Sequence, residues 1–227
     1  MKNLLVVCVV IAVASVFQSC SDSTTSPSTD SYRTLRQNRY DKSGVLTNYW
    51  DYSYSNNLLL KVSYYDSTKL LISYTEYSHN SSNQRVKSTS YDANGNPSGS
   101  YTTFEYNAEG KLTKSNIYIP TRLYGYVTYT FDASGNKVNS THYSIDSYGI
   151  PTQNESTVFL YDSSGKRIRA NTYNSSGGLN SYSTNEFSDG RLKKVMFYDE
   201  QSKLIASRIF EYEAGISVIN PTDFYEY

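Results

Sequence analysis

A short phrase recurs along this chain from Tyr32 onward and constrains its fold more than any other feature. The phrase is an aromatic residue, an Asp or Asn, two small polar residues and a Gly, and internal repeats are the first signal to interpret in a sequence. A period of about 13 residues is too short for a strand-helix unit and fits one strand of about 8 residues plus one tight turn. Complete copies are Tyr40–Gly44, Tyr91–Gly95, Tyr106–Gly110, Phe131–Gly135, Tyr161–Gly165 and Tyr173–Gly177, and weaker copies begin at Tyr54, Tyr65, Tyr77, Tyr143, Phe187, Tyr198 and Tyr212.

The phrase has the chemistry of a hairpin turn. An Asp or Asn at the first turn position bonds to its own backbone two residues further on, and Gly supplies the left-handed residue that closes a type I turn with a bulge. Each phrase therefore ends one strand and begins its antiparallel neighbour. The wide gap between Tyr106 and Phe131 spans about two periods, and Tyr118 is the candidate for the missing copy.

Between the turns, residues rich in Tyr, Thr, Val and Ile alternate, as in 124–131 and 204–212, a pattern typical of strands. The sequence therefore predicts an all-β fold, a long, curved antiparallel meander of about 14 short strands. Open sheets of more than roughly ten strands curl, so the sheet could be open, curled or split in two. We expect the strands to be too few to wrap a cavity. A compact sandwich is the alternative, although its long crossovers disagree with the evenly spaced hairpins.

The phrase Tyr-Asp-x-x-Gly followed by Leu, Val or Ile resembles the tyrosine-aspartate (YD) repeats of the Rhs family, over most of residues 40–212. In that family the repeats form a long β-sheet that spirals into a hollow shell around a toxin segment. The resemblance implies a shared strand-turn-strand unit here, whereas function must be argued from a site. The unit has its aromatic position at Tyr40, Tyr91, Tyr106, Phe131, Tyr161 and Tyr173, and its turn glycine at Gly44, Gly95, Gly110, Gly135, Gly165 and Gly177.

The N-terminal residues have the features of an export signal. Met1-Lys2-Asn3 is positive, and the apolar run Leu4–Phe17 is shorter than the roughly 20 residues that span a bilayer. Ser19-Cys20-Ser21 resembles a bacterial lipoprotein site, which implies lipid attachment at Cys20; the alternative is an ordinary signal peptide with an incidental cysteine. We expect a signal peptide at 1–19, a flexible Ser/Thr-rich tether at 20–31 and a β-repeat domain at 32–227.

Composition and charge disfavour several classes of function. The 21 Lys and Arg residues balance 21 Asp and Glu residues, so the basic excess that neutralises phosphates is absent and we expect no nucleic-acid partner. Two Cys and two His residues are too few for a zinc or iron-sulfur site, so we expect no metal and no cofactor. The stretch from Asp92 to Asn96 lacks the spacing of a calcium loop, because its Gly comes too early.

No catalytic motif stands out. His79 and His142 lie far apart in polar stretches typical of surface residues, no Gly-x-Ser-x-Gly sequence is present, and many acids already have a role in turns. The 25 tyrosines suit a thin sheet, because a ring packs while its hydroxyl meets water. Aromatic clusters also form interaction surfaces, and the densest candidates for binding are Trp50, Tyr52 and Tyr54, which alternation places on one face, together with Tyr124 and Tyr126.

These features predict a cell-envelope binding or structural module without catalytic activity, joined to the membrane through its N-terminal lipid. Its partner would be a glycan or an envelope protein. Ser21 after the cysteine resembles outer-membrane sorting, so we expect an outer-membrane lipoprotein, periplasmic or surface-exposed. Two alternatives stay open: an enzyme that acts on an envelope polymer with a pair of acids, and a protein that assembles by strand addition.

Overall fold

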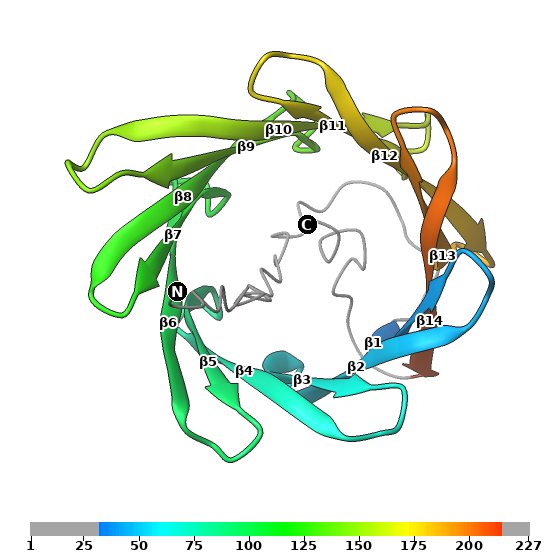
Figure 1. Cartoon of the computed structure of the whole chain (residues 1–227), viewed down its shortest axis with the longest axis horizontal. Coiled ribbons are helices and arrows are strands. Elements are labelled where there is room, and N and C mark those ends of the chain that lie inside the picture. Colours follow the sequence, from blue (N-terminus) through cyan, green and yellow to red (C-terminus); the bar gives the residue numbers. More distant parts are fainter. Residues whose placement is uncertain (1–31, 215–227) are drawn as a thin grey trace, which may run out of the picture.

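The computed structural model describes residues 32–214, and all the regular elements in that range are β-strands (Figure 1). The fourteen strands follow one another as antiparallel neighbours, as the repeat predicts. Their bounds are β1 (Tyr32–Asp41), β2 (Leu46–Ser55), β3 (Leu58–Asp66), β4 (Leu71–His79), β5 (Arg85–Asp92), β6 (Pro97–Tyr106), β7 (Leu112–Ile119), β8 (Arg122–Phe131), β9 (Lys137–Ile145), β10 (Pro151–Tyr161), β11 (Arg167–Asn174), β12 (Leu179–Ser188), β13 (Arg191–Asp199) and β14 (Leu204–Ala214).

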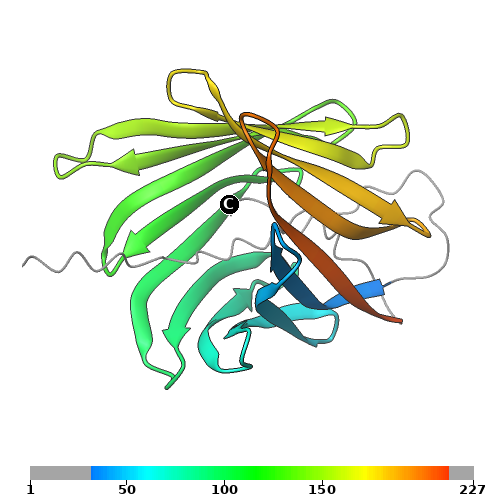
Figure 2. The same cartoon turned by 45° about the vertical axis from the view of Figure 1, so that its right-hand side comes forward.

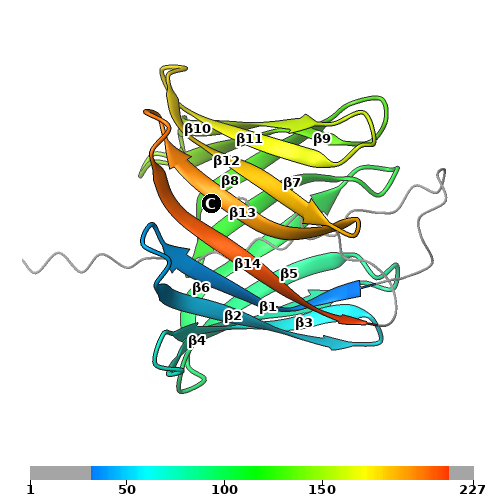
Figure 3. The ribbon, with the colours of Figure 1, turned by 90° about the vertical axis from the view of Figure 1, so that its right-hand side faces the viewer.

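The sheet closes into a barrel, which corrects two expectations from the sequence. Strand β1 pairs with β2 on one side and with β14 on the other, from Tyr32 opposite Ala214 to Asp41 opposite Ala206. The strands run obliquely around the barrel axis (Figures 2 and 3), as closure requires. The meander is therefore a ring with an interior, neither an open curved sheet nor a sandwich, and its strands suffice to enclose a cavity.

The turns have the predicted structure. In the Asp92 turn, the Asp92 carboxylate accepts the backbone N–H groups of Asn94 at 2.9 Å and Asn96 at 2.8 Å, while Gly95 donates its N–H to the Asp92 carbonyl at 3.2 Å. Gly95 has a φ of +86°, a conformation that Gly adopts without steric cost. Hydrogen bonds to the carboxylate, first from the Asn96 side chain, lower the pKa of Asp92.

Non-glycine residues occupy the same left-handed position in three other turns. They are Lys69, Asn83 and Ser202, with φ values of 73°, 62° and 66°. Their hydrogen bonds match those of the glycine turns, for example the Ser202 N–H donated to the Asp199 carbonyl at 3.1 Å. The weaker copies at Tyr65 and Tyr198 therefore form the same turn without its Gly, whereas those at Tyr54 and Phe187 lead into two-residue turns, 56–57 and 189–190. Tyr118 lies at the end of β7, as the missing copy of the phrase predicts.

Aromatic side chains line the interior face near one end of the barrel. They form clusters around Tyr52, around Phe104 and around Phe210, and Leu59, Leu112 and Leu192 each pack into one of the three. Tyrosines near the ends of four strands also donate their hydroxyls to a carbonyl of the preceding strand. These pairs are Tyr54 with Thr34 at 3.0 Å, Tyr106 with Arg85 at 2.8 Å, Tyr161 with Lys137 at 2.8 Å and Tyr212 with Leu192 at 2.6 Å.

The recurring aromatic faces opposite sides at the two rims. At five of the seven turns where an odd-numbered strand runs into an even-numbered one, as at Tyr65 or Tyr91, the ring lies on the outer face and stacks on another tyrosine. Where an even-numbered strand runs into an odd-numbered one, as at Tyr106 or Phe131, the ring packs into an interior cluster. The structural repeat is therefore two strands and two phrases long.

Candidate binding surfaces of the barrel

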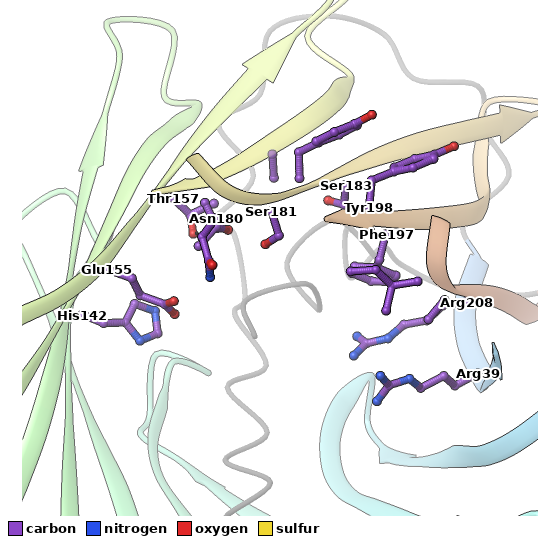
Figure 4. A pocket seen from close by; sticks show the side chains of 15 residues that line it. Arg39, His142, Glu155, Thr157, Asn180, Ser181, Ser183, Phe197, Tyr198 and Arg208 are labelled. Atoms are coloured by element: carbon purple, nitrogen blue, oxygen red, sulfur yellow. Dashed lines mark hydrogen bonds between the residues drawn. The ribbon is translucent and has the colours of Figure 1, made fainter. Parts of the chain in front are cut away.

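A cavity of about 340 Å³ lies on the interior side of the wall formed by β9 to β14 and β1 (Figure 4). Its position follows from alternation, because successive residues of a strand point to opposite faces. Phe197 points toward the cavity whereas its neighbour Tyr198 points away from it (Figure 4). Side chains around it include Arg39, His142, Glu155, Thr157, Thr172, Ser181, Ser183, Phe197 and Arg208.

Two arginines form one side of this cavity. Arg39 on β1 and Arg208 on β14 are direct partners in the register that closes the barrel, and both guanidinium groups extend into the interior (Figure 4). Arg208 is 8% exposed, and its guanidinium lies 5.3 Å from the ring centre of Trp50 and 5.0 Å from that of Phe197. Cation-π contacts of this kind hold the charged group against aromatic surface.

The Gln37 amide fixes the position of Arg208 further. With the amide oxygen toward the arginine, it accepts hydrogen bonds from Nε and Nη1 of Arg208 at 3.1 Å each, and the amide nitrogen donates to the Tyr52 hydroxyl at 2.9 Å. The opposite orientation would place the amide nitrogen against the guanidinium, so that two donors would face each other. The orientation with the oxygen toward Arg208 gives both the guanidinium and the amide a hydrogen-bond partner. Gln37 is itself buried, at 2% exposed, and the Arg208 side chain is thus preorganised.

The other side of the cavity carries an imidazole and a carboxylate. His142 on β9 and Glu155 on β10 are register partners, and both side chains point toward the interior (Figure 4). Hydroxyls lie between the two sides, including those of Thr157 and Thr172, whose oxygens are 3.2 Å apart. The cavity therefore joins two cations, one acid and several hydroxyls around the aromatic ring of Phe197.

Trp50, Tyr52 and Tyr54 lie on one face, as their alternation predicts, and the structure shows that this is the interior face. All three belong to or pack against one aromatic cluster of that face. Trp50 is half-buried and Tyr52 is buried, so these rings mainly support the barrel wall and Arg208. Burial raises the pKa of the Tyr54 hydroxyl, which donates to the Thr34 carbonyl.

Tyr124 and Tyr126 lie on the outer face of β8, so the two groups of predicted aromatics do not form one site. Tyr126 stacks on Tyr143 with ring centres 4.7 Å apart, and the Lys114 ammonium lies 4.4 Å from the Tyr126 ring centre. Tyr124 is 55% exposed. The barrel wall therefore separates this pair from the Trp50 row.

The stack of cation, tyrosine and tyrosine recurs around the outer face. Ring centres of the paired tyrosines lie 4.7 to 4.9 Å apart, and the cation lies 3.5 to 4.5 Å from the first ring centre. Cross-strand aromatic pairs and cation-π contacts are units of sheet stabilisation. The members are Arg36, Tyr49 and Tyr65; Lys61, Tyr74 and Tyr91; Lys87, Tyr101 and Tyr118; Lys114, Tyr126 and Tyr143; and Arg169, Tyr182 and Tyr198.

Sequence reasoning misses the residues that line the cavity. Alternation assigns Arg39 to the same face as Gln37, but it carries no signal that β1 and β14 are neighbours. Arg39 and Arg208 therefore meet only once the ring closes. The polar stretch around His142 predicts a surface residue, and its strand pattern gives no sign that Glu155 lies opposite it.

The acidic side chains and possible metal ligands of the described range can be placed relative to the cavity. Glu155 is the one carboxylate among the described residues that line the cavity, so this site does not bring a pair of acids together. Within residues 32–214, no three His, Cys, Asp or Glu side chains converge as a metal site. The same residues contain no helix that is long and apolar enough to cross a bilayer. Cys20, with the leader and tether, lies outside the described residues, as does the segment 215–227.

No protein-family model matches this chain, and neither does any curated protein. Among solved structures, it is similar to the TcdB2-TccC3-Cdc42 complex, with 14% identity over 74% of this chain and 11% of that chain and a TM-score of 0.33. It is also similar to a porin-like protein from Bacteroides uniformis, with 11% identity over 79% of this chain and 96% of that chain and a TM-score of 0.34. A third similar structure is a DUF3836 family protein from Bacteroides vulgatus, with 13% identity over 40% of this chain and 98% of that chain and a TM-score of 0.28.

These similarities are distant and concern strand architecture. The chain spans about a tenth of the length of the first solved chains that it matches, 11% and 10% of them. The YD-repeat resemblance is thus accompanied by distant structural similarity to TccC3-containing chains and by no sequence family.

Proposed function

We propose that this protein is a non-catalytic binding module of the bacterial envelope, tethered to the outer membrane by a lipid on Cys20, and that it binds its ligand inside the barrel. The observation that carries the proposal is the interior cavity with its preorganised Arg208 and the facing Glu155. Its volume of about 340 Å³ is within the range of small-molecule sites, which combine apolar walls with a few fixed polar groups.

Two alternatives receive less support from the described residues. An enzyme with paired acids needs two convergent carboxylates, whereas the cavity lining contains Glu155 alone among described residues. Assembly by strand addition needs a free sheet edge, whereas every strand from β1 to β14 has a neighbour on both sides.

A binding screen with a variant that fills the cavity tests the proposal. Trp50→Ala is a poor probe, because Trp50 packs against the barrel wall and against Arg208. Thr157→Phe instead adds a ring at a half-buried position in the cavity. The matched control, Tyr124→Ala, removes an exposed ring from the outer face.

The screen uses envelope glycans, small metabolites and envelope proteins against the chain that starts at Ser21. We expect at least one small ligand whose binding Thr157→Phe abolishes and Tyr124→Ala preserves, with both variants keeping the circular dichroism spectrum of the parent. If Tyr124→Ala abolishes the binding of every ligand found and Thr157→Phe preserves it, the binding surface lies on the outer face and the proposal is wrong.

A further inference from the structure

The paired arginines identify the chemical class of the ligand, an inference that rests on the proposed function. We propose that the cavity binds a small anionic sugar, with the oxyanion of a carboxylate or phosphate held between Arg39 and Arg208. The ring of the sugar would lie along the hydroxyls and the aromatic surface beside them.

The first argument is the juxtaposition of the two guanidinium groups. Like charges directly opposite each other on neighbouring strands destabilise a sheet, yet Arg39 and Arg208 are register partners at the closing seam. Within residues 32–214, the Arg39 guanidinium makes no hydrogen bond or ion pair. An oxyanion between the two groups converts their repulsion into charged, bidentate hydrogen bonds, the geometry for which arginine is suited.

The second argument is the distribution of charge over the two faces of the sheet. The chain as a whole is neutral, but more cations point inward than Arg39 and Arg208. Arg85, Lys137 and Arg167 lie over interior aromatic rings, with Arg85 4.3 Å from the ring centre of Phe104. Many acids lie instead at the starts of turns, and Asp51 pairs with Arg36 on the outer face. Cations gathered inside low-dielectric walls concentrate a positive potential and so favour an anionic guest.

The third argument is the nature of the remaining cavity wall. Thr157, Thr172, Ser181 and Ser183 supply hydroxyls, and Phe197 supplies an aromatic face. Hydroxyl groups that both donate and accept hydrogen bonds, next to an aromatic ring, match the alternating polar and apolar surface of a sugar. Glu155, across the cavity from the arginines (Figure 4), can accept hydrogen bonds from hydroxyls at the far end of the ligand and so fix its orientation.

Isothermal titration calorimetry on the chain that starts at Ser21 tests this inference with three probes. They are glucuronate, glucose 6-phosphate and neutral glucose. We expect saturable binding of at least one anionic sugar, and binding of glucose weaker by at least about tenfold, the loss expected for a charged hydrogen bond. Which of the two anions binds distinguishes a carboxylate ligand from a phosphate ligand.

Arg39→Gln is the decisive variant, because Arg39 is exposed and its loss spares the packed Arg208. We expect it to weaken binding of the anionic sugar by about tenfold or more. Lys42→Gln in the β1–β2 turn removes the same charge from an exposed site and should leave binding unchanged.

Three results would overturn the inference: no saturable binding of either anion, glucose binding as tightly as the anions, or equal affinities for the parent and Arg39→Gln. Each leaves the cavity-filling screen as the independent test of the proposed function, since that screen depends on no particular ligand charge.

Discussion

Single residues determine where this chain turns. Each complete phrase places a side-chain acceptor at the start of the turn and a left-handed residue three positions later, and Gly165 is a clear case. Its φ is +79°, and an added Cβ would have no heavy atom within 4 Å. Any cost of a substitution there must therefore come from the backbone conformation, with no contribution from a clash.

We expect Gly165→Val to lower the free energy of unfolding by about 1–2 kcal/mol, the cost of a left-handed conformation for a residue with a side chain. Thermal unfolding followed by circular dichroism measures the change, at roughly 2–4 °C for each kcal/mol in a chain of this size. The reverse change, Ser202→Gly at a φ of 66°, should leave stability equal or increase it. If both variants lose stability equally, conformational strain is the wrong explanation.

At the level of strands and hairpins, the recurring outer stacks provide cross-strand contacts. Lys114 on β7 lies over Tyr126 on β8, which stacks in turn on Tyr143 of β9. One such stack thus joins three neighbouring strands. These contacts also explain why so many tyrosines occur in the chain: on the outer face they pair with one another, and on the interior face they pack into clusters near one rim.

A double-mutant cycle measures one of these contacts. We expect Lys114→Met and Tyr126→Leu to show a coupling energy of about 0.5–1 kcal/mol in urea unfolding, as for exposed cation-π pairs. A cycle that pairs Tyr126→Leu with Lys193→Met, an exposed residue on β13, should give no coupling. Equal coupling energies in the two cycles would show that the effect comes from the overall charge of the protein and that the Lys114–Tyr126 contact contributes nothing specific.

The hairpins of this fold could be predicted from sequence because their determinants are local. Asp92, Asn94 and Gly95 lie within one turn, and the hydrogen bonds that join them involve no residue outside it. Alternation also assigns Trp50 and Tyr52 correctly to one face. The cavity could not be predicted, because Arg39 and Arg208 stand at opposite ends of the repeat and meet only when β1 pairs with β14.

Closure is the property of the whole molecule that sequence reasoning misses. The seam depends on contacts between distant residues, such as the Asn38 amide that donates to the Glu211 carboxylate at 2.5 Å, and no local phrase specifies them. Curvature accumulates from the twist of every strand pair, so a small difference per strand decides between an open sheet and a ring.

A circular permutant tests closure directly. Tyr32 and Ala214 are register partners, so a short linker can join 214 to 32, while new termini open the exposed turn at Tyr148, which is 87% exposed. We expect the permutant to fold with the β-rich spectrum of the parent and to unfold cooperatively. In an open meander these ends would lie about 60 Å apart at the spacing of neighbouring strands, too far for a short linker. The control is the original chain cleaved at Tyr148. If the cleaved chain stays folded and the permutant does not fold, the closed barrel is contradicted.

The two kinds of rim aromatic restrict how such a protein can change its size over evolutionary time. Loss or duplication of a single strand would reverse the direction of every later strand. Phrases whose rings face the interior would then lie at the rim where the rings face outward, so viable changes in length should come as whole pairs of strands. Relatives of this protein would then form barrels with a discrete series of diameters, in which each step adds one hairpin of two strands to the wall.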